Sequence, residues 1–251
     1  YDLGEGVTAF STTRHGGVSE ANYASFNINP YCGDSADHVA RNRQLLADRL
    51  GLPASHIVLP HQVHGIEHRA VAPELLDMSD AVRDKILDGV DMVTTSMTGV
   101  CIGVSTADCI PVLLYDPVAR ATAAIHAGWR GTLQRICQRA VMAMQLHYGT
   151  TPDRLRAVVG PGISLANFEV GQEVYDQFLQ AGFDLTETAE WHTKWHLDLP
   201  GINIRELIGC GVAPEHIHHA GICTFDHADD YFSARRLGID SGRIYTGILM
   251  R

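Results

Sequence analysis

Four side chains that can bind a metal or act in catalysis stand in three short segments that each contain a turn. They are His61 and His64 in "HQVHG", Cys109 in "STADC" and His126 in "IHAGWRG". Each segment ends or interrupts an apolar run of the kind that forms a buried strand. Functional groups commonly lie on such turns, where a rigid sheet holds them in place. We therefore expect these side chains to project from sheet edges into a shared pocket.

Three of these residues form a donor set that suits zinc. Three His or Cys ligands with an open fourth position make a catalytic zinc site, and here they would be His64, Cys109 and His126. Zinc in such a site lowers the pKa of a bound water to about 7 and supplies a hydroxide nucleophile. The spacing matches no short zinc motif. Two alternatives therefore stay open: a buried thiol beside ordinary turn histidines, or a Cys109 thiolate nucleophile with His126 or His64 as base.

Two arginines and two carboxylates complete the candidate site. Arg14 precedes a Gly-Gly turn in "FSTTRHGGVSE", and Arg130 lies directly ahead of the strongest predicted helix. An arginine beside a helix N-terminus can hold an anion such as phosphate. Asp108 is adjacent to Cys109 and can orient a metal ligand, and Glu169 follows a glycine turn in "GPGISLANFEVG". Surface ion pairs or packing are the alternative roles for all four residues.

Strands and helices alternate along the chain, which predicts one α/β domain over residues 1–251. A short strand followed by a histidine-bearing turn is expected in 56–65. Further strands are expected within 90–96, 99–116 (broken at "STADC"), 120–128 and 155–163, and turns alternate with strands in "HHAGICT", "DYFSARR" and "GRIYTGILM". The expected helices lie at 34–51, 73–88, 131–149 and 168–182. The third is the clearest, because its apolar residues recur at helical spacing, Thr132 can cap it and Gly149 ends it.

Composition narrows the classes of partner. The 251 residues are 45% hydrophobic and carry a formal net charge of -10. Nucleic acid and anionic membranes both need a basic face, so neither is expected as the main partner. A small anionic substrate in a local basic pocket remains compatible with this charge. The six cysteines form no C-x-x-C pair and are expected to be reduced thiols of a cytoplasmic protein. An acidic compact domain of this kind is expected to be a monomer or a weak homodimer.

Several common catalytic motifs are missing from the sequence. It contains no G-x-G-x-x-G, no Walker A lysine loop and no H-E-x-x-H. It also contains no G-x-S-x-G. These absences weigh against dinucleotide enzymes, P-loop NTPases, common metalloproteases and α/β-hydrolases.

The quoted segments, taken in order and together with "CTF" and "YFSARR", resemble the YfiH/laccase-domain family. This family was once labelled polyphenol oxidase or multicopper laccase and was later recognised as purine nucleoside enzymes. The resemblance runs from about Phe10 to Arg243, and "ADCIPVL" and "HAGWRG" carry most of its specificity. It implies a single α/β domain whose β-sheets are sandwiched between helices. It also implies a zinc site built from His64, Cys109 and His126.

The implied activity is phosphorolysis of adenosine, inosine and S-methyl-5'-thioadenosine, with adenosine deamination as a second reaction. Zinc would be the cofactor and inorganic phosphate the co-substrate. Deamination needs an activated water at C6 of adenine, whereas phosphorolysis needs phosphate aimed at C1′ of the ribose. Arg14 and Arg130 are the candidates for binding phosphate, and Asp108 and Glu169 are lesser candidates for moving protons.

The sequence departs from the family pattern at four places. Gly162 stands where a cysteine is expected, Ser164 replaces a glycine, and Ala234 replaces an aromatic residue. The segment 73–88 lengthens the chain between His64 and Cys109. These departures bear on substrate preference more than on the metal site.

Two other functions use some of the same residues. A copper-dependent polyphenol oxidase would need several H-x-H pairs, and the chain has one, His216-Ile217-His218. Copper in a site of two histidines and a cysteine could give adventitious oxidation. A metal-dependent binding module is the non-enzymatic alternative, although a Cys/His cluster at strand ends suits a flat interface poorly.

Overall fold

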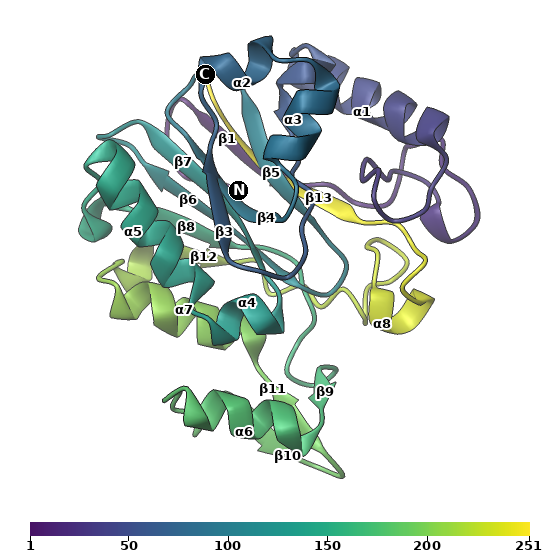
Figure 1. The fold of residues 1–251 in the computed structure, drawn as a ribbon. Coiled ribbons are helices and arrows are strands. Elements are labelled where there is room, and N and C mark those ends of the chain that lie inside the picture. The colour runs from purple at the N-terminus through teal and green to yellow at the C-terminus, as the bar shows by residue number, and fades with distance from the viewer.

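The computed structural model describes residues 1–251, which form two large β-sheets packed face to face between two groups of helices (Figure 1). A third, small sheet lies apart from these layers. No helix is both long enough and apolar enough to cross a membrane. The arrangement confirms the expected α/β class, with sheets sandwiched between helices.

One large sheet has four strands and joins the two ends of the chain. In spatial order its strands are β1 (Val7–Ser11), β13 (Ile244–Met250), β5 (Cys101–Thr106) and β2 (Ile57–Val58). β13 is antiparallel to both of its neighbours, and β2 is parallel to β5. The first and last strands of the chain therefore pair directly.

The other large sheet has six strands. In spatial order they are β12 (Ile217–His219), β8 (Arg156–Val159), β6 (Ile110–Asp116), β7 (Ala121–Ala127), β4 (Val90–Thr95) and β3 (Glu67–Ala70). The two edge pairs are parallel and the inner pairs are antiparallel. β4, β6 and β7 are buried along their whole length. Burial on both faces accounts for their nearly continuous apolar sequences.

Eight α-helices and four 3-10 helices cover the sheets. The α-helices are α1 (Ala36–Leu50), α2 (Pro73–Asp77), α3 (Asp80–Ile86), α4 (Trp129–Leu133), α5 (Ile136–Tyr148), α6 (Gln172–Gln180), α7 (Leu199–Gly209) and α8 (Ala234–Leu237). The 3-10 helices span Ala21–Tyr23, Ala54–His56, Pro152–Arg154 and Pro214–His216. The helices expected at 34–51 and 73–88 are confirmed, the second as the pair α2 and α3.

Three apolar layers hold these elements together. In the largest, side chains of β6 and β7 pack against α5 and α7. The second lies between the two sheets and includes Val104 of β5 and Leu113 of β6. In the third, Leu46 and Leu50 of α1 pack near Tyr245 of β13. Removing this apolar surface from water is the main force that stacks the layers.

The break at "STADC" is the point where the chain passes from one sheet to the other. β5 belongs to the four-stranded sheet and β6 to the six-stranded sheet, so residues 107–109 form the crossover. β6 then pairs antiparallel with β7, with Ile110 opposite Ala127. This register brings the residue before β6 and the end of β7 to the same edge, which is where Cys109 and His126 lie.

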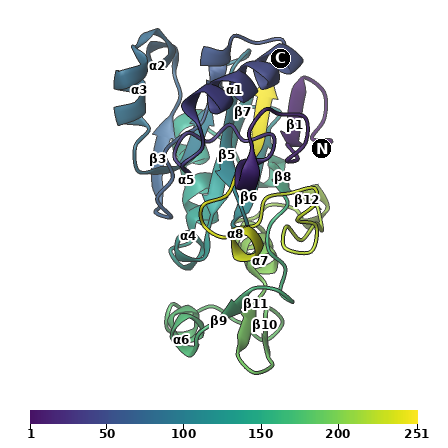
Figure 2. The same ribbon diagram turned by 90° about the vertical axis from the view of Figure 1, so that its right-hand side faces the viewer.

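A small lobe projects from the main body, as Figures 1 and 2 show from two directions. It contains α6 and a three-stranded sheet made of β10 (Ala189–Trp191), β11 (Trp195–Leu197) and β9 (Glu169–Val170). The buried side chains of Phe178, Phe183 and Leu185 extend the largest apolar layer into this lobe. The lobe is thus packed against the body by the same core.

Two helix boundaries differ from the sequence prediction. The long helix expected from Thr132 is divided, because Arg135 takes a left-handed conformation with φ of 60° between α4 and α5. The predicted helix at 168–182 starts later, since residues 169–170 pair with β11 and α6 begins at Gln172. The segment "SARR", expected among turns and strands, forms the short helix α8.

Candidate metal centre

The structure brings His64, Cys109 and His126 together at one edge of the sheets. One ligand atom from each residue lies within 4.8 Å of the other two. His64 is on the turn that follows β2, Cys109 is at the crossover from β5 to β6, and His126 is near the end of β7. His64 is exposed, Cys109 is half-buried and His126 is buried. The three residues, called the triad below, thus reach one point from three separate elements.

A buried carboxylate on β4, Asp91, orients two members of the triad. Its Oδ1 lies 2.7 Å from Nδ1 of His126, so Nε2 of that ring is the nitrogen left for a metal. The same carboxylate accepts hydrogen bonds from the backbone N–H groups of Val63, His64 and Gly65, at 3.2, 3.0 and 2.7 Å. A carboxylate behind a ligating histidine fixes its tautomer and raises its basicity.

The charges of the triad favour metal binding. Burial raises the pKa of the Cys109 thiol, but the neighbouring His126 and His64 outweigh this effect and lower the pKa to about 6. Burial lowers the pKa of His126, but the Cys109 thiolate and Asp91 outweigh it and raise the pKa to about 9. Both shifts favour the charged forms, a thiolate beside an imidazolium, in the metal-free site. A metal cation would replace the imidazolium proton.

The glycine after His126 leaves room for the triad. A Cβ atom on Gly128 would lie 3.0 Å from Cδ2 of His64 and 3.1 Å from Sγ of Cys109. Such contacts are tighter than ordinary van der Waals packing, so a side chain there would push the ligands apart. This crowding accounts for the glycine at the turn between β7 and α4.

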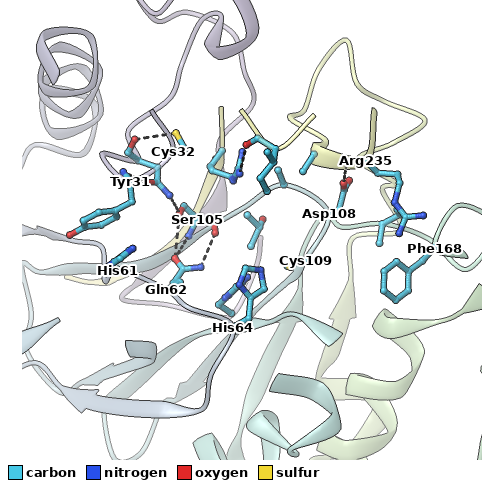
Figure 3. Close-up of a pocket in the computed structure, with 18 residues that line it drawn as sticks. Tyr31, Cys32, His61, Gln62, His64, Ser105, Asp108, Cys109, Phe168 and Arg235 are labelled. Atoms are coloured by element: carbon cyan, nitrogen blue, oxygen red, sulfur yellow. Dashed lines mark hydrogen bonds between the residues drawn. The ribbon is translucent and has the colours of Figure 1, made fainter. Parts of the chain in front are cut away.

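The triad opens into a cavity of about 490 Å³. This volume lies within the range of small-molecule sites. Figure 3 shows His64 in the middle of the cavity, Tyr31 and His61 toward one end, and Phe168 and Arg235 toward the other. Aromatic faces and polar groups therefore flank the candidate metal centre on both sides.

The end of the cavity at His61 is linked to the segment 73–88. The rings of Tyr31 and His61 stack with centroids 4.2 Å apart. Nδ1 of His61 lies 2.6 Å from Oδ1 of Asp88, two residues beyond the end of α3. His61 is thus bound to the segment 73–88 and does not belong to the triad.

Paired hydrogen bonds fix the wall between Tyr31 and the triad. Gln62 accepts a bond from the backbone N–H of Ser105 and donates one to the Ser105 carbonyl, both at 2.8 Å. Asn29 donates to Oγ of Ser105 at 2.6 Å. These bonds fasten the turn that bears His64 to the end of β5.

Asp108 lines the cavity, but its carboxylate oxygens are already engaged. Oδ1 accepts a hydrogen bond from Oγ1 of Thr224 and Oδ2 accepts one from the backbone N–H of Arg235, both at 2.7 Å. The residue itself has a φ of 84° in the turn before Cys109. Asp108 therefore fixes the position of the Cys109 turn against the C-terminal part of the chain.

The other three sequence candidates do not line this cavity. Arg14 donates to the carbonyls of Ala24 and Ala228 at 2.8 and 2.7 Å. Arg130 is exposed on α4 with its guanidinium 4.4 Å from the centre of the Trp129 ring. Glu169 forms an exposed ion pair with Lys194 at 2.7 Å. The structure gives these three side chains other partners.

Sequence reasoning missed Asp91, although the strand "VDMVTT" carries a signal for it. An acidic residue in a strand that is otherwise apolar is costly to bury unless it has partners. Asp91 is fully buried, and its carboxylate accepts four hydrogen bonds, three from backbone N–H groups and one from the His126 ring. A lone carboxylate within an apolar run is therefore the feature that indicates its role.

Fold and site together define an α/β protein with a ligand set of two histidines and a cysteine at a small-molecule cavity. The family model "Multi-copper polyphenol oxidoreductase laccase" matches residues 8–251. The chain belongs to this family, in which the YfiH and YlmD proteins are its relatives.

The similar proteins carry two kinds of name. A purine nucleoside phosphorylase of Bacteroides thetaiotaomicron is 44% identical over 97% of this chain and 92% of its own length. Adenosine deaminase RL5, from an unknown prokaryotic organism, is 40% identical over 97% of this chain and 94% of its own. The crystal structure of YlmD from Geobacillus stearothermophilus covers 100% of this chain and 94% of that one, with 30% identity and a TM-score of 0.91. These relatives indicate an enzyme.

Proposed function

We propose that the protein is a zinc-dependent purine nucleoside phosphorylase with adenosine deaminase activity. Its substrates would be adenosine, inosine and S-methyl-5'-thioadenosine, with inorganic phosphate as co-substrate. The observation that carries the proposal is the triad, whose ligand atoms lie within 4.8 Å of one another at a cavity of small-molecule size. The names of the relatives that are 44% and 40% identical support the two reactions.

The residues present fit zinc. Two imidazole nitrogens and a thiolate are donors that zinc accepts in tetrahedral sites with one open position. Gly128 leaves space beside the side chains of His64 and Cys109. Asp91 binds Nδ1 of His126, so Nε2 of that ring is left for the metal. When bound, zinc would act as a Lewis acid and lower the pKa of a bound water.

The chain's own residues would orient the substrate. The rings of Tyr31 and Phe168 lie toward opposite ends of the cavity and offer apolar faces to a purine or ribose. The hydrogen-bonded wall of Gln62 and Ser105 keeps the cavity open between them. Asp108 holds the Cys109 turn in place. Binding is thus built on rigid elements, which favours a preorganised site.

The oxidase alternative predicts further copper ligands beside the triad. The pair His216 and His218 instead lines a separate surface hollow with Asp2 and Arg156. The described residues gather one group of three or more metal-binding side chains, which is the triad. A mononuclear site with these ligands suits the zinc proposal. Metal analysis of protein purified without added metal would distinguish zinc from copper.

The cysteine-nucleophile alternative uses the same residues differently. The low pKa of Cys109, about 6, would give a thiolate without a metal. Removal of zinc by a chelator separates the two mechanisms. If Cys109 is the nucleophile, the protein keeps its activity without zinc. If Cys109 is a zinc ligand, the protein loses its activity.

Inosine tests the proposal with few side reactions, because it has no amino group for deamination to remove. We expect zinc-loaded protein to release hypoxanthine from inosine only when phosphate is present. Chelated protein should be inactive, and added zinc should restore activity. Hypoxanthine release that is equal with and without phosphate would contradict phosphorolysis.

A further inference from the structure

We propose that Arg235 is the residue that binds the phosphate co-substrate. This inference rests on the proposed function and concerns the same cavity. The residues expected from sequence to bind phosphate, Arg14 and Arg130, do not line the cavity. Two other arginines, Arg235 and Arg243, do. Their different hydrogen bonding decides between them.

The guanidinium of Arg243 is already occupied. Its Nη1 donates to the carbonyls of Ser241 and Gly242 at 2.6 and 2.9 Å, and its Nη2 donates to the carbonyl of Ile239 at 2.9 Å. Nη1 also lies 3.3 Å from Oγ of Ser241. Arg243 therefore closes the loop before β13, and few of its donors remain for a ligand.

The guanidinium of Arg235 has free donors. Its one hydrogen bond in the structure runs from Nη2 to the carbonyl of Glu169, at 3.2 Å. The remaining N–H groups face no protein acceptor, and a guanidinium presents them in a fork that matches two oxygens of a phosphate. The guanidinium carbon lies 5.6 Å from the centre of the Phe168 ring, which supports it from one side.

The backbone of Arg235 is fixed to the segment that carries a triad residue. Its N–H donates to Oδ2 of Asp108, the residue before Cys109, at 2.7 Å. This bond fixes the point from which the Arg235 side chain enters the cavity relative to the triad. The protein as a whole has a formal net charge of -10, which repels phosphate. A free guanidinium at the cavity supplies the local attraction that the rest of the surface lacks.

The reaction requires phosphate close to the ribose. An oxygen of HPO4²⁻ forms the bond to C1′ while the bond between C1′ and N9 breaks. The electron pair of that bond goes to the purine, and the proton of HPO4²⁻ ends on a purine nitrogen. Arg235 would hold the phosphate and contribute positive charge next to the attacking group. Positioning of this kind is a major source of rate acceleration.

Arg236 provides a matched control. It lies on the same helix, and its guanidinium rests 5.3 Å from the centre of the Phe225 ring and donates to the Phe225 carbonyl at 3.3 Å. It does not line the cavity. Arg235→Gln and Arg236→Gln therefore remove the same charge from neighbouring positions, inside and outside the proposed site. Arg235→Lys keeps the charge but loses the fork.

The test is the KM for phosphate in the phosphorolysis of inosine by the zinc-loaded variants. We expect Arg235→Gln to raise this KM on the order of 10- to 100-fold, as for loss of a hydrogen bond to a charged group. Arg235→Lys should restore part of the difference, and Arg236→Gln should match the wild type. The KM for inosine and the zinc content should stay within about twofold of the wild type in all three variants.

An unchanged KM for phosphate in Arg235→Gln would overturn the inference, as would an equal rise in Arg236→Gln. If the wild type shows no phosphorolysis, the proposed function fails. Calorimetric titration with inorganic phosphate then tests the anion site independently. Loss of phosphate binding in Arg235→Gln alone would still support the anion site, and equal binding in wild type and variant would overturn it.

Discussion

At the scale of single residues, the site depends on a buried carboxylate that does not line the cavity. Asp91 receives hydrogen bonds from the His126 ring and from the backbone of the turn that bears His64. Its pKa is lowered, because the hydrogen bond and charge of His126 outweigh the opposing effect of burial. Two of the three triad residues therefore depend on one buried negative charge.

We predict that Asp91→Asn lowers zinc affinity by about 10- to 100-fold, as is usual for loss of a carboxylate behind a ligating histidine. Competition with a chromogenic chelator measures the affinity. Asp116→Asn is the matched control. Asp116 is also a fully buried strand carboxylate, but it caps the backbone of Val118 and Ala119. Equal zinc affinity in the two variants would show that Asp91 has only a structural role.

A second residue-scale prediction concerns Gly128. In Gly128→Ala the new Cβ would meet the His64 ring and the Cys109 sulfur at about 3 Å. We expect zinc affinity and inosine turnover to fall at least about tenfold, because ligands displaced from their geometry bind the metal poorly. Gly209→Ala is the control, since nothing lies within 4 Å of a Cβ at that position. Wild-type zinc binding in Gly128→Ala would contradict the crowding.

Residue types predict part of this site, but partners decide the rest. His64, Cys109 and His126 are found from their types and turns, because metal donors at strand ends are unusual enough to notice. Their role as metal ligands stays a prediction. The local sequence of Arg14 and Arg130 could not show that their guanidinium groups have other contacts.

At the scale of elements, α4 and the turn at Gly128 are supported from behind by α7. The buried side chain of Asn203 on α7 donates to Oγ1 of Thr132 on α4 at 3.0 Å and accepts from Sγ of Cys137 on α5 at 3.1 Å. One amide thus links three helices. These bonds also occupy the Thr132 hydroxyl that the sequence suggested as a helix cap.

We predict that Asn203→Ala lowers the free energy of unfolding by about 2 kcal/mol, because it leaves buried polar groups without partners. Urea denaturation measures the change. Ile208→Ala on the same helix is the comparison, since its side chain is 40% exposed and the substitution should cost less than about 1 kcal/mol. Similar losses in the two variants would argue against the link.

The elements differ in how far the sequence predicts them. The apolar runs of β4 to β7 are distinctive because both faces of these strands are buried. The helical spacing of apolar residues continues across Arg135, so the break between α4 and α5 leaves no gap in the pattern. The hairpin β10–β11 is short and partly exposed, and burial imposes little alternation on its sequence. Neither it nor α7 was predicted.

At the scale of the whole molecule, stability depends on pH through a half-buried histidine of β3 that does not belong to the triad. His68 on β3 lies 2.8 Å from Oγ1 of Thr94. Burial, followed by the nearby His147 and Arg69, lowers its pKa from 6.5 to about 4. The unfolded chain therefore binds this proton at a higher pH than the folded protein does. The stabilisation is complete above pH 6.5 and is lost as the pH falls through about 4.

We predict that His68→Gln loses less stability than the wild type when the pH falls from neutral to about 4.5. Solvent screens a half-buried side chain, so the expected difference is on the order of 1 kcal/mol. Urea denaturation at several pH values measures it. His15→Gln, at an exposed histidine, should follow the wild type. Parallel pH profiles for His68→Gln and the wild type would contradict the prediction.

Chromatography of adenosine incubated with zinc-loaded protein tests whether purine nucleoside chemistry takes place at the triad. We predict that adenine appears only when phosphate is present, that inosine appears with or without it, and that Cys109→Ala forms neither. Adenosine that stays unchanged in both conditions, with zinc bound to the wild type, would contradict this prediction. Equal conversion by Cys109→Ala would place the chemistry outside the triad.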